Sequence, residues 1–210
     1  FSETFLQREV RAMIKAGVEV ELLSLHRGEP AFEGRPVHCF SKWRLWTLVY
    51  LLPWALWRRG DGLLRLAAEM NTRRPPSALN LFENLLGFGA AIVMEKRIRE
   101  IGPNVSHCVW SSAPAAFGLM AEVLVGTPFS TGAHAYDIFE RGGDWLLALK
   151  CRRAKRVHVS AKVAEMRIRR LCDAAKVRLI RRGLNCLPQA RDPRARCERL
   201  RIVCVARFVE

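Results

Sequence analysis

The feature that most constrains the fold is a regular alternation of short strand patterns and helix patterns from residue 105 onward. This alternation is typical of βαβ units, which build a mostly parallel sheet with helices on both faces. We therefore predict an α/β, Rossmann-like fold. The predicted strands are 105–110, 128–133, 156–161 and 176–183, and the predicted helices between them are 113–124, 144–154 and 162–172.

The amino-terminal part predicts a helix that leads into a strand, followed by a mainly helical stretch. Residues 2–16 carry apolar residues at helical spacing and end at Gly17, and residues 18–25 run apolar as a strand does. From 37 to about 100 the pattern is helical. This stretch contains a Trp-rich segment at 45–57, a polar break at 71–77 and a helix at 90–101.

The carboxyl-terminal residues interrupt the alternation. Residues 186–199 contain two prolines, many charges and no periodicity, which is typical of a linker. Residues 200–208 then resemble a new strand. We therefore expect one domain over 1–185, a linker over 186–199, and the first strand of a truncated second domain over 200–210.

Basic residues are concentrated in the last third of the chain. Residues 141–210 hold 20 Lys/Arg against 6 Asp/Glu, and nearly all of the net charge of +15 lies there. Such a block favours anionic partners such as phosphates, acidic lipids or nucleic acid, without choosing among them. The basic runs at 150–156 and 167–170 are most simply a solvated face.

Cysteine usage and apolar runs limit the class of protein further. The seven cysteines are scattered and form no C-x-x-C pair, so we expect reduced thiols in a cytosolic protein. No secretory signal is visible. The apolar run at 45–57 has 13 residues and contains Pro53, whereas a membrane-spanning helix needs about 20. We expect a buried helix there; the alternative is a helix lying in a membrane interface.

His134 and Asp137 follow a predicted strand in the sequence PFSTGAHAYDIFE (128–140). In parallel sheets ligands bind beyond the carboxyl ends of the strands, so this histidine lies where a ligand is expected. A simpler interpretation is that His134 only ends the strand. Asp137 is expected to cap a short helix, with Glu140 at the capping-box position.

Several enzyme classes lack support in the sequence. No D-x-D motif occurs, which argues against a manganese-dependent GT-A transferase. Neither a P-loop motif nor a dinucleotide-binding G-x-G-x-x-G motif occurs. The G-x-S-x-G elbow of a serine hydrolase is also missing.

Four stretches together resemble one family, the retaining nucleotide-sugar glycosyltransferases of family 4, which have the GT-B architecture of two facing Rossmann-like domains. They are SETFLQREV at 2–10, PFSTGAHAYDIF at 128–139, KVRLIRRGLN at 176–185 and RIVCVARFVE at 201–210. No single stretch is specific, but the four occur in the family's order. Departures include Ala206, Arg182 and Asn185 at positions where the family has Gly, Asn and Asp. The resemblance implies the acceptor-side half of such an enzyme, lacking most of the second domain.

The resemblance also implies roles for individual residues. His134 would face the cleft between domains and contact the donor sugar. Glu3, which on the sequence alone belongs to ordinary helix capping, would lie on the acceptor side. Asp137 would take part in substrate binding, and Arg207 would hold the donor phosphates. The implied reaction transfers a sugar from a nucleotide-sugar donor to a polysaccharide or lipid-linked acceptor with retention, and needs no metal or cofactor. The chain alone is expected to be inactive.

Two further expectations concern partners. A lipid-linked acceptor would explain both the basic helices and the Trp-rich segment, through peripheral docking on an anionic membrane surface at the inner face of the membrane. The alternative to the transferase is a basic α/β module that binds nucleic acid. Few aromatic residues alternate with the basic ones and no recognised binding motif occurs, so nucleic acid is the less favoured partner.

Overall fold

The central element of the protein is a four-stranded parallel sheet, seen in a computed structural model that describes residues 4–71 and 74–181. Its strands lie in the order β4-β5-β6-β7, and every neighbouring pair is parallel. The α/β class and the parallel sheet are thus confirmed. The strands are shorter than predicted: β4 (Ser106–Cys108), β5 (Phe129–Ala133), β6 (Arg156–Val159) and β7 (Val177–Leu179).

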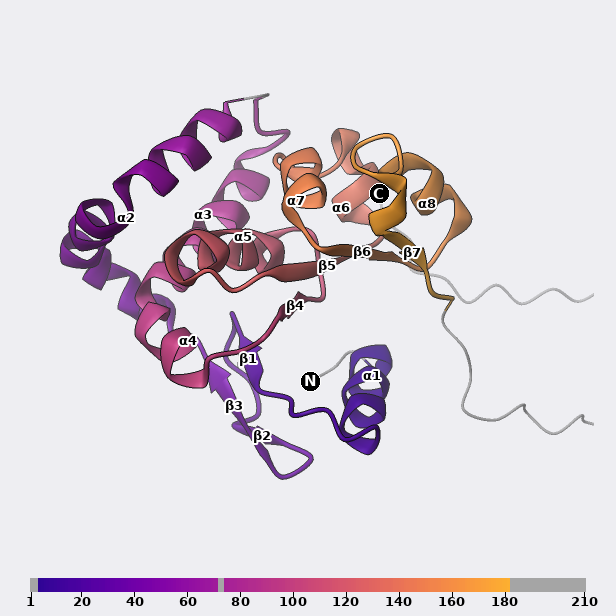
Figure 1. Cartoon of the computed structure of the whole chain (residues 1–210), viewed down its shortest axis with the longest axis horizontal. Helices are drawn as coiled ribbons and strands as arrows, with labels where there is room; N and C mark the ends of the chain where they lie inside the picture. The colour runs from indigo at the N-terminus through magenta and orange to yellow at the C-terminus, as the bar shows by residue number, and fades with distance from the viewer. Residues whose placement is uncertain (1–3, 72–73, 182–210) are drawn as a thin grey trace, which may run out of the picture.

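Helices cover the two faces of this sheet unequally. The crossover helices α5 (Ala113–Val125), α7 (Leu147–Arg153) and α8 (Lys162–Ile168) all lie on one face (Figure 1). Each crossover moves one strand further in the same direction, and right-handed connections then place every helix on the same side. Buried Val157, Val159 and Val177 point toward these helices.

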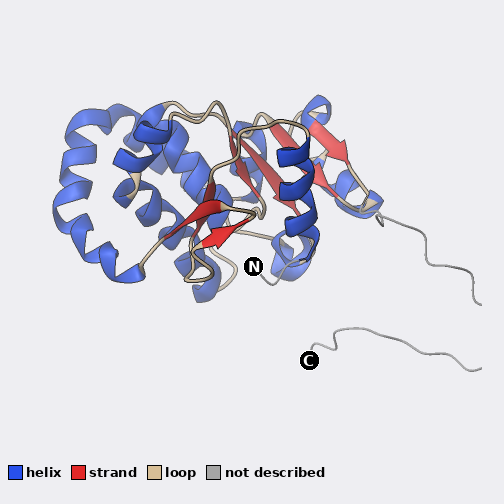
Figure 2. Cartoon of the chain, turned by 90° about the horizontal axis from the view of Figure 1, so that it is seen from below, coloured by secondary structure: helices blue, strands red, loops and turns tan. Residues whose placement is uncertain are grey.

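The opposite face of the sheet is largely polar. It carries His107, Arg156, His158 and Arg178, which alternate with the buried residues of the same strands. Among the described helices, only α1 (Thr4–Lys15) lies on this side, in front of the sheet when the molecule is seen from below (Figure 2). The predicted arrangement with helices on both faces is therefore present in an uneven form.

The amino-terminal region has a small core of its own. β1 (Leu22–Ser24) pairs in parallel with β3 (Arg35–Cys39), and the two-residue strand β2 (Ala31–Phe32) pairs antiparallel with β3. Glu33 and Gly34 both have positive φ, as a tight hairpin turn between β2 and β3 requires. The side chains of this core come from α1, β1 and β3: Val10, Leu22 and Val37, with Leu6, Met13 and Ile14 packed against them.

The main core lies between α3 (Ala78–Val93), α5 and the four-stranded sheet. Gly87 allows α3 to approach α5 closely, because a Cβ at this position would lie 2.2 Å from the carbonyl oxygen of Ala113. Ser77 caps α3 by accepting a hydrogen bond from the backbone N–H of Asn80. The predicted helix at 90–101 is in fact the end of α3 and a separate helix, α4 (Glu95–Ile101).

The Trp-rich segment forms the 3-10 helix η1 (Lys42–Thr47) and the long helix α2 (Leu48–Met70), which runs along the outer edge of the molecule (Figure 1). Our expectation of a buried helix is wrong for its aromatic residues. Trp46, Trp54 and Trp57 are 68%, 51% and 76% exposed. The inner face alone is buried, through Ala55, Leu63 and Leu66.

Within the described residues, no single helix is long and apolar enough to cross a membrane. The bent pair α3 and α4 passes such a test by length and composition only, and the last seven residues of α3 are all buried in the protein core. The remaining elements are the short helix α6 (Tyr136–Phe139) and the 3-10 helices η2 (Glu140–Gly142) and η3 (Ala174–Lys176). The predicted linker and the strand at 200–208 lie outside the described residues.

Candidate functional site

The candidate site lies at the carboxyl ends of β4, β5 and β6. Because the three strands are parallel and adjacent, the turns that follow them meet at one edge of the sheet. The turn after β4 supplies Trp110, Ser111 and Ser112; His134 comes directly after β5; and Ser160 comes directly after β6. The prediction that His134 follows the carboxyl end of a strand is confirmed.

The imidazole of His134 is held from several sides and is 6% exposed. Its Nδ1 lies 3.4 Å from the hydroxyl oxygen of Ser160. Trp110 and His158 each meet the ring edge-on, with ring centroids 5.6 Å and 5.2 Å away. A Cβ at position 132 would lie 2.9 Å from Nε2, so Gly132 leaves the space that the ring occupies. The surroundings therefore fix the orientation of the ring.

The backbone immediately after His134 is strained. Ala135 has φ 39° and ψ −109°, a conformation that residues with a Cβ rarely adopt. Strained backbone of this kind persists where the surrounding structure enforces it, and it is concentrated at functional sites. Next in the chain, the hydroxyl of Tyr136 lies 3.1 Å from that of Ser112, which joins the turns after β5 and β4. Burial is the main cause that raises the pKa of Tyr136.

Asp137 does not cap a helix, contrary to our prediction. α6 begins after Ala135 and has no side-chain cap. The carboxylate of Asp137 is instead turned inward, is 1% exposed, and accepts a hydrogen bond on Oδ2 from the backbone N–H of Ser111 at 2.8 Å. The physical reason is that β4 and β5 bring the Ser111 turn against this position, a contact that sequence spacing does not report.

The pKa of Asp137 is raised from 3.8 to about 6, mainly because burial disfavours the charged carboxylate. The backbone N–H groups of Ser111, Asp137 and His134 oppose this effect and lower the pKa. Ser111 donates to Oδ2 at 2.8 Å, whereas Oδ1 is buried without a hydrogen-bond partner among the described residues. Asp137 is thus a buried acid that gains a proton at mildly acidic pH.

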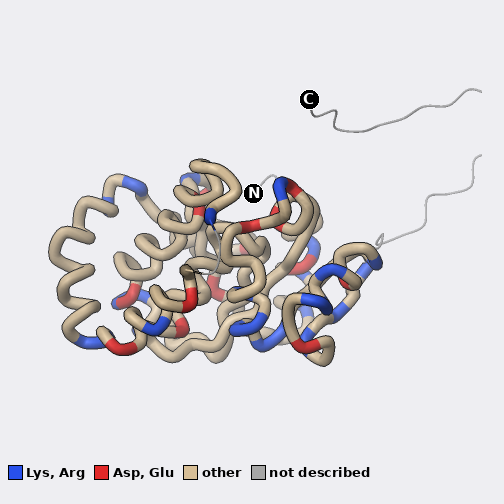
Figure 3. Tube along the Cα trace, turned by 90° about the horizontal axis from the view of Figure 1, so that it is seen from above, with Lys and Arg blue, Asp and Glu red and all other residues tan. Residues whose placement is uncertain are grey.

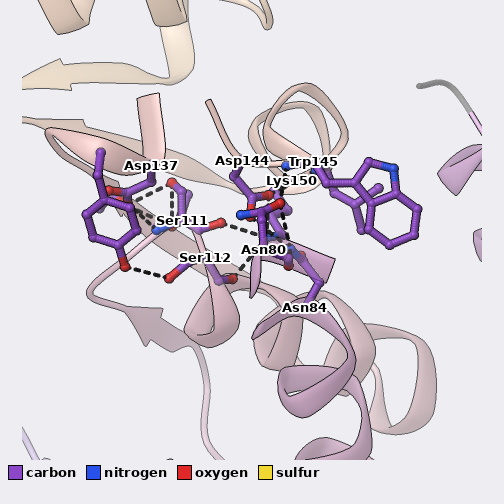
Figure 4. Close-up of polar contacts among 12 residues, drawn as sticks. Asn80, Asn84, Ser111, Ser112, Asp137, Asp144, Trp145 and Lys150 are labelled. Carbon is purple, nitrogen blue, oxygen red and sulfur yellow. Dashed lines mark hydrogen bonds and ion pairs between the residues drawn. The ribbon is translucent and has the colours of Figure 1, made fainter. Parts of the chain in front are cut away.

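Lys150 forms a fully buried ion pair behind the site (Figure 4). Its ammonium donates to Asp144 Oδ1 at 2.7 Å and to the carbonyl oxygens of Ser111 and Ser112 at 2.7 and 2.9 Å. All three of its N–H donors therefore have partners. Burial lowers the pKa of Lys150, and the neighbouring Asp144 opposes that shift. The prediction of a solvated basic face over 150–156 is wrong for this lysine.

Two asparagines of α3 complete the network around Asp144 (Figure 4). The side-chain amides of Asn80 and Asn84 each donate to Asp144 Oδ2 at 2.9 Å, and the backbone N–H of Leu146 donates to Oδ1 at 2.9 Å. The oxygen of Asn80 accepts from the backbone N–H of Trp145 at 2.8 Å. Through this network, which we call the Lys150 clamp, α3, α7 and the turn after β4 are fixed to one another.

Sequence reasoning did not identify the Lys150 clamp. One signal was available: Asn80 and Asn84 stand four positions apart in a helix whose only other polar side chain is Glu83, and they therefore lie on the same face. A buried face with two amides needs a polar partner. Nothing in the sequence indicates that the partner is Asp144, which lies 60 residues further along the chain than Asn84.

Two cavities lie away from this site. One of about 520 Å³ is lined by the end of β3, Arg44 and α4, and another of about 370 Å³ lies between α4 and the start of β5. Within residues 4–71 and 74–181, no group of three or more His, Cys, Asp or Glu residues is arranged to hold a metal ion.

Of the other predicted site residues, Glu3 and Arg207 lie outside the described part of the chain. The helix that follows Glu3 does reach the site, because the ring of Phe5 in α1 meets that of Trp110 at 5.9 Å. Trp110 in turn contacts His134. The first turn of α1 and the turns after β4 and β5 therefore surround one position.

We compared the chain with protein-family models, with curated proteins and with solved structures, and found no match in any of the three comparisons. The class that the fold defines is accordingly a mixed α/β protein with a four-stranded parallel sheet flanked by helices. The assignment of a function rests on the geometry of the site itself.

Proposed function

We propose that this chain is the acceptor-side part of a retaining, GT-B-type glycosyltransferase that transfers a sugar from a nucleotide-sugar donor to a polysaccharide or lipid-linked acceptor. The observation that carries the proposal is the placement of His134. Its ring is held at the carboxyl edge of a parallel sheet between Trp110, His158 and Ser160. Ligands of open α/β sheets bind at this edge.

The polar groups of the site suit a sugar better than an anion. Sugar hydroxyls both donate and accept hydrogen bonds, and so do imidazole, serine and tyrosine side chains. The buried cation of the region, Lys150, is already bonded to three oxygens and is not directed at a ligand. The apolar face of a sugar also packs well on an aromatic ring such as that of Trp110.

In the proposed reaction the contribution of His134 comes from the fixed position of its ring. A ring fixed by Ser160, Trp110 and His158 loses little entropy when it hydrogen-bonds a donor-sugar hydroxyl, so most of that interaction remains available to the transition state. The diphosphate would be held by a second domain that includes Arg207. The proposed reaction uses the nucleotide sugar as a substrate and requires no cofactor.

The test is sugar transfer by a protein that carries this chain together with its donor-binding domain. Replacing His134 by Ala should lower kcat about 100-fold or more with an unchanged far-ultraviolet circular dichroism spectrum. His26, in an exposed loop, supplies the matched control, and His26→Ala should transfer sugar at the wild-type rate. Wild-type turnover in the His134→Ala protein would overturn the proposed role of this residue.

A second candidate function is supported by the polar face of the sheet. Arg156 and Arg178 stand on neighbouring strands of that face, and both are exposed. A cationic sheet face of this kind is able to contact the phosphates of nucleic acid. Filter binding at increasing salt separates the two candidates: steeply salt-dependent binding that is lost in Arg156→Glu/Arg178→Glu would favour this second function over sugar transfer.

A further inference from the structure

The outer surface of η1 and α2 is the largest feature that the proposed function leaves unexplained. Four of the six tryptophans of the chain lie on it. We call this surface the Trp face; the exposed fractions of its principal residues are Trp43 81%, Trp46 68%, Val49 82%, Tyr50 54%, Trp54 51% and Trp57 76%. Most of these positions are three or four residues apart, so they form a continuous stripe along the helices.

The opposite side of α2 is apolar as well. Ala55, Leu63 and Leu66 are buried against the main core. A helix that is apolar on both sides is usually covered on both sides. On the Trp face, ring contacts join Trp46 with Tyr50 and Trp54 with Trp57. The solvent-facing side of a surface helix is normally polar, so the Trp face is much more apolar than the exposed side of such a helix.

Positive charge borders the Trp face. Residues 42–65 contain five Lys/Arg against one Asp/Glu. Arg58 is paired with Glu95 and lies over the ring of Trp54. The other four, Lys42, Arg44, Arg59 and Arg65, form no ion pair with any described residue. In Figure 3 the long helix at the left of the view is α2, whose first ten residues are uncharged and whose acidic residues are Asp61 and Glu69.

A cationic cavity adjoins the start of the Trp face. Arg44, which stands between Trp43 and Trp46 in η1, lines the cavity of about 520 Å³ together with Lys96 and Arg97 of α4. Arg97 also contacts His38 and Glu100 on the cavity wall. A cavity of this size has room for a phosphate-bearing headgroup, while the neighbouring tryptophans match the interfacial region of a bilayer.

We propose that the Trp face docks on an anionic lipid surface. Tryptophan and tyrosine favour the boundary between acyl chains and headgroups, and flanking Lys and Arg favour acidic headgroups. A second copy of the chain fits less well, because a two-fold interface through this face would bring the two sets of unpaired cations together. This docking depends only on η1, α2 and α4, and it is independent of the sugar-transfer proposal.

The test is co-sedimentation of the full chain with vesicles. Vesicles of phosphatidylcholine that contain about 30 mol% phosphatidylglycerol should pellet the protein, and pure phosphatidylcholine should pellet far less, because each surface cation contributes about fivefold in partition onto anionic lipid. Tryptophan emission should shift to shorter wavelength on binding. Trp54→Ser/Trp57→Ser should lower the partition coefficient about tenfold or more, since two large apolar surfaces are no longer inserted.

A second pair of variants separates the contribution of charge to vesicle binding from that of apolar area. Arg59→Glu/Arg65→Glu should abolish the preference for phosphatidylglycerol. The matched control is Val163→Ser/Arg170→Glu on and just after α8, which removes an exposed apolar residue and a cation elsewhere and should bind as the wild type does.

Three results would overturn the proposal. The first is failure of the wild-type chain to pellet with anionic vesicles. The second is equal loss of binding in the α8 control, which would show a general charge effect. The third is dimerisation through the Trp face: a dimer by light scattering that becomes a monomer in Trp54→Ser/Trp57→Ser, with no vesicle binding, would identify a second copy as the occupant.

Discussion

The carboxyl edge of the sheet and the outer face of α2 both place side chains in the environment they normally avoid. At the carboxyl edge Lys150 and Asp144 are charged groups with no exposure, and each finds its partners within the protein. On α2 the reverse occurs: Trp43, Trp46 and Trp57 are mostly exposed. In the first region the described residues satisfy every charge of the ion pair, whereas in the second they leave large aromatic side chains exposed.

Removing the cation from the Lys150 clamp should have the largest effect on stability. Lys150→Met should lower the free energy of unfolding by about 3–5 kcal/mol, because Asp144 then remains buried without its counter-charge. Urea denaturation measures the change. Lys155→Met, at an exposed position five residues along, should stay within about 0.5 kcal/mol. A loss below about 1 kcal/mol for Lys150→Met would show that buried Asp144 does not depend on Lys150 as its counter-charge.

Two glycine-to-alanine substitutions test how tightly the main core and α2 are packed. Gly87→Ala places a Cβ 2.2 Å from the carbonyl oxygen of Ala113, so α3 and α5 must separate; we expect a loss of about 2–3 kcal/mol in thermal or urea unfolding. Gly60→Ala in α2 meets no atom within 4 Å. It should gain up to about 1 kcal/mol, since alanine loses less backbone entropy on folding. Equal effects at the two positions would contradict the packing described for α3 and α5.

The smallest effect concerns the pH dependence of the carboxyl edge. Because the folded-state pKa of Asp137 is about 6 and the ordinary value is 3.8, the folded protein binds its proton more tightly than the unfolded chain does. This contribution to stability is complete below the ordinary pKa and is lost as pH rises toward about 6. We expect the loss to be on the order of 2 kcal/mol between about pH 4 and about pH 7.

The variant Asp137→Asn isolates that contribution. An amide keeps an oxygen that is able to accept from the N–H of Ser111 but does not titrate, so urea unfolding of this variant should depend less on pH than that of the wild type. Asp61→Asn, at an exposed position of α2, should follow the wild-type curve. Parallel curves for the wild type and Asp137→Asn would show that Asp137 titrates at its ordinary pKa in the folded protein.

The sequence predicted the fold better than the site. Periodicity located all four strands of the parallel sheet and the helices between them, although several elements are shorter than predicted. The strands β2 and β3 were not predicted. A two-residue strand such as β2 has no periodicity, and β3 overlaps the start of the stretch from residue 37 that we wrongly expected to be helical throughout. The end of α3 and α4 were merged into one predicted helix, since the break at Met94 carries neither Gly nor Pro.

Some residues of the site were likewise predicted correctly and others were not. His134 lies after a strand as predicted, because strand ends are visible in a local pattern. Asp137 was expected to cap a helix and instead binds Ser111, which lies 26 positions earlier. Lys150 stands in a basic run that looks solvated, yet it is buried because α7 packs its inner face against α5 and β5. Contacts between distant segments leave no local signal.

The sequence by itself determined the α/β class, the order of the parallel strands along the chain and the strand-end position of His134. These features depend on periodicity and on the hand of the connections, which are local properties of the chain. Only the tertiary structure decided that Asp137 and Lys150 face inward and that the tryptophans of η1 and α2 face outward. Whether a side chain is buried depends on which distant segment packs against it, and that is a property of the folded molecule alone.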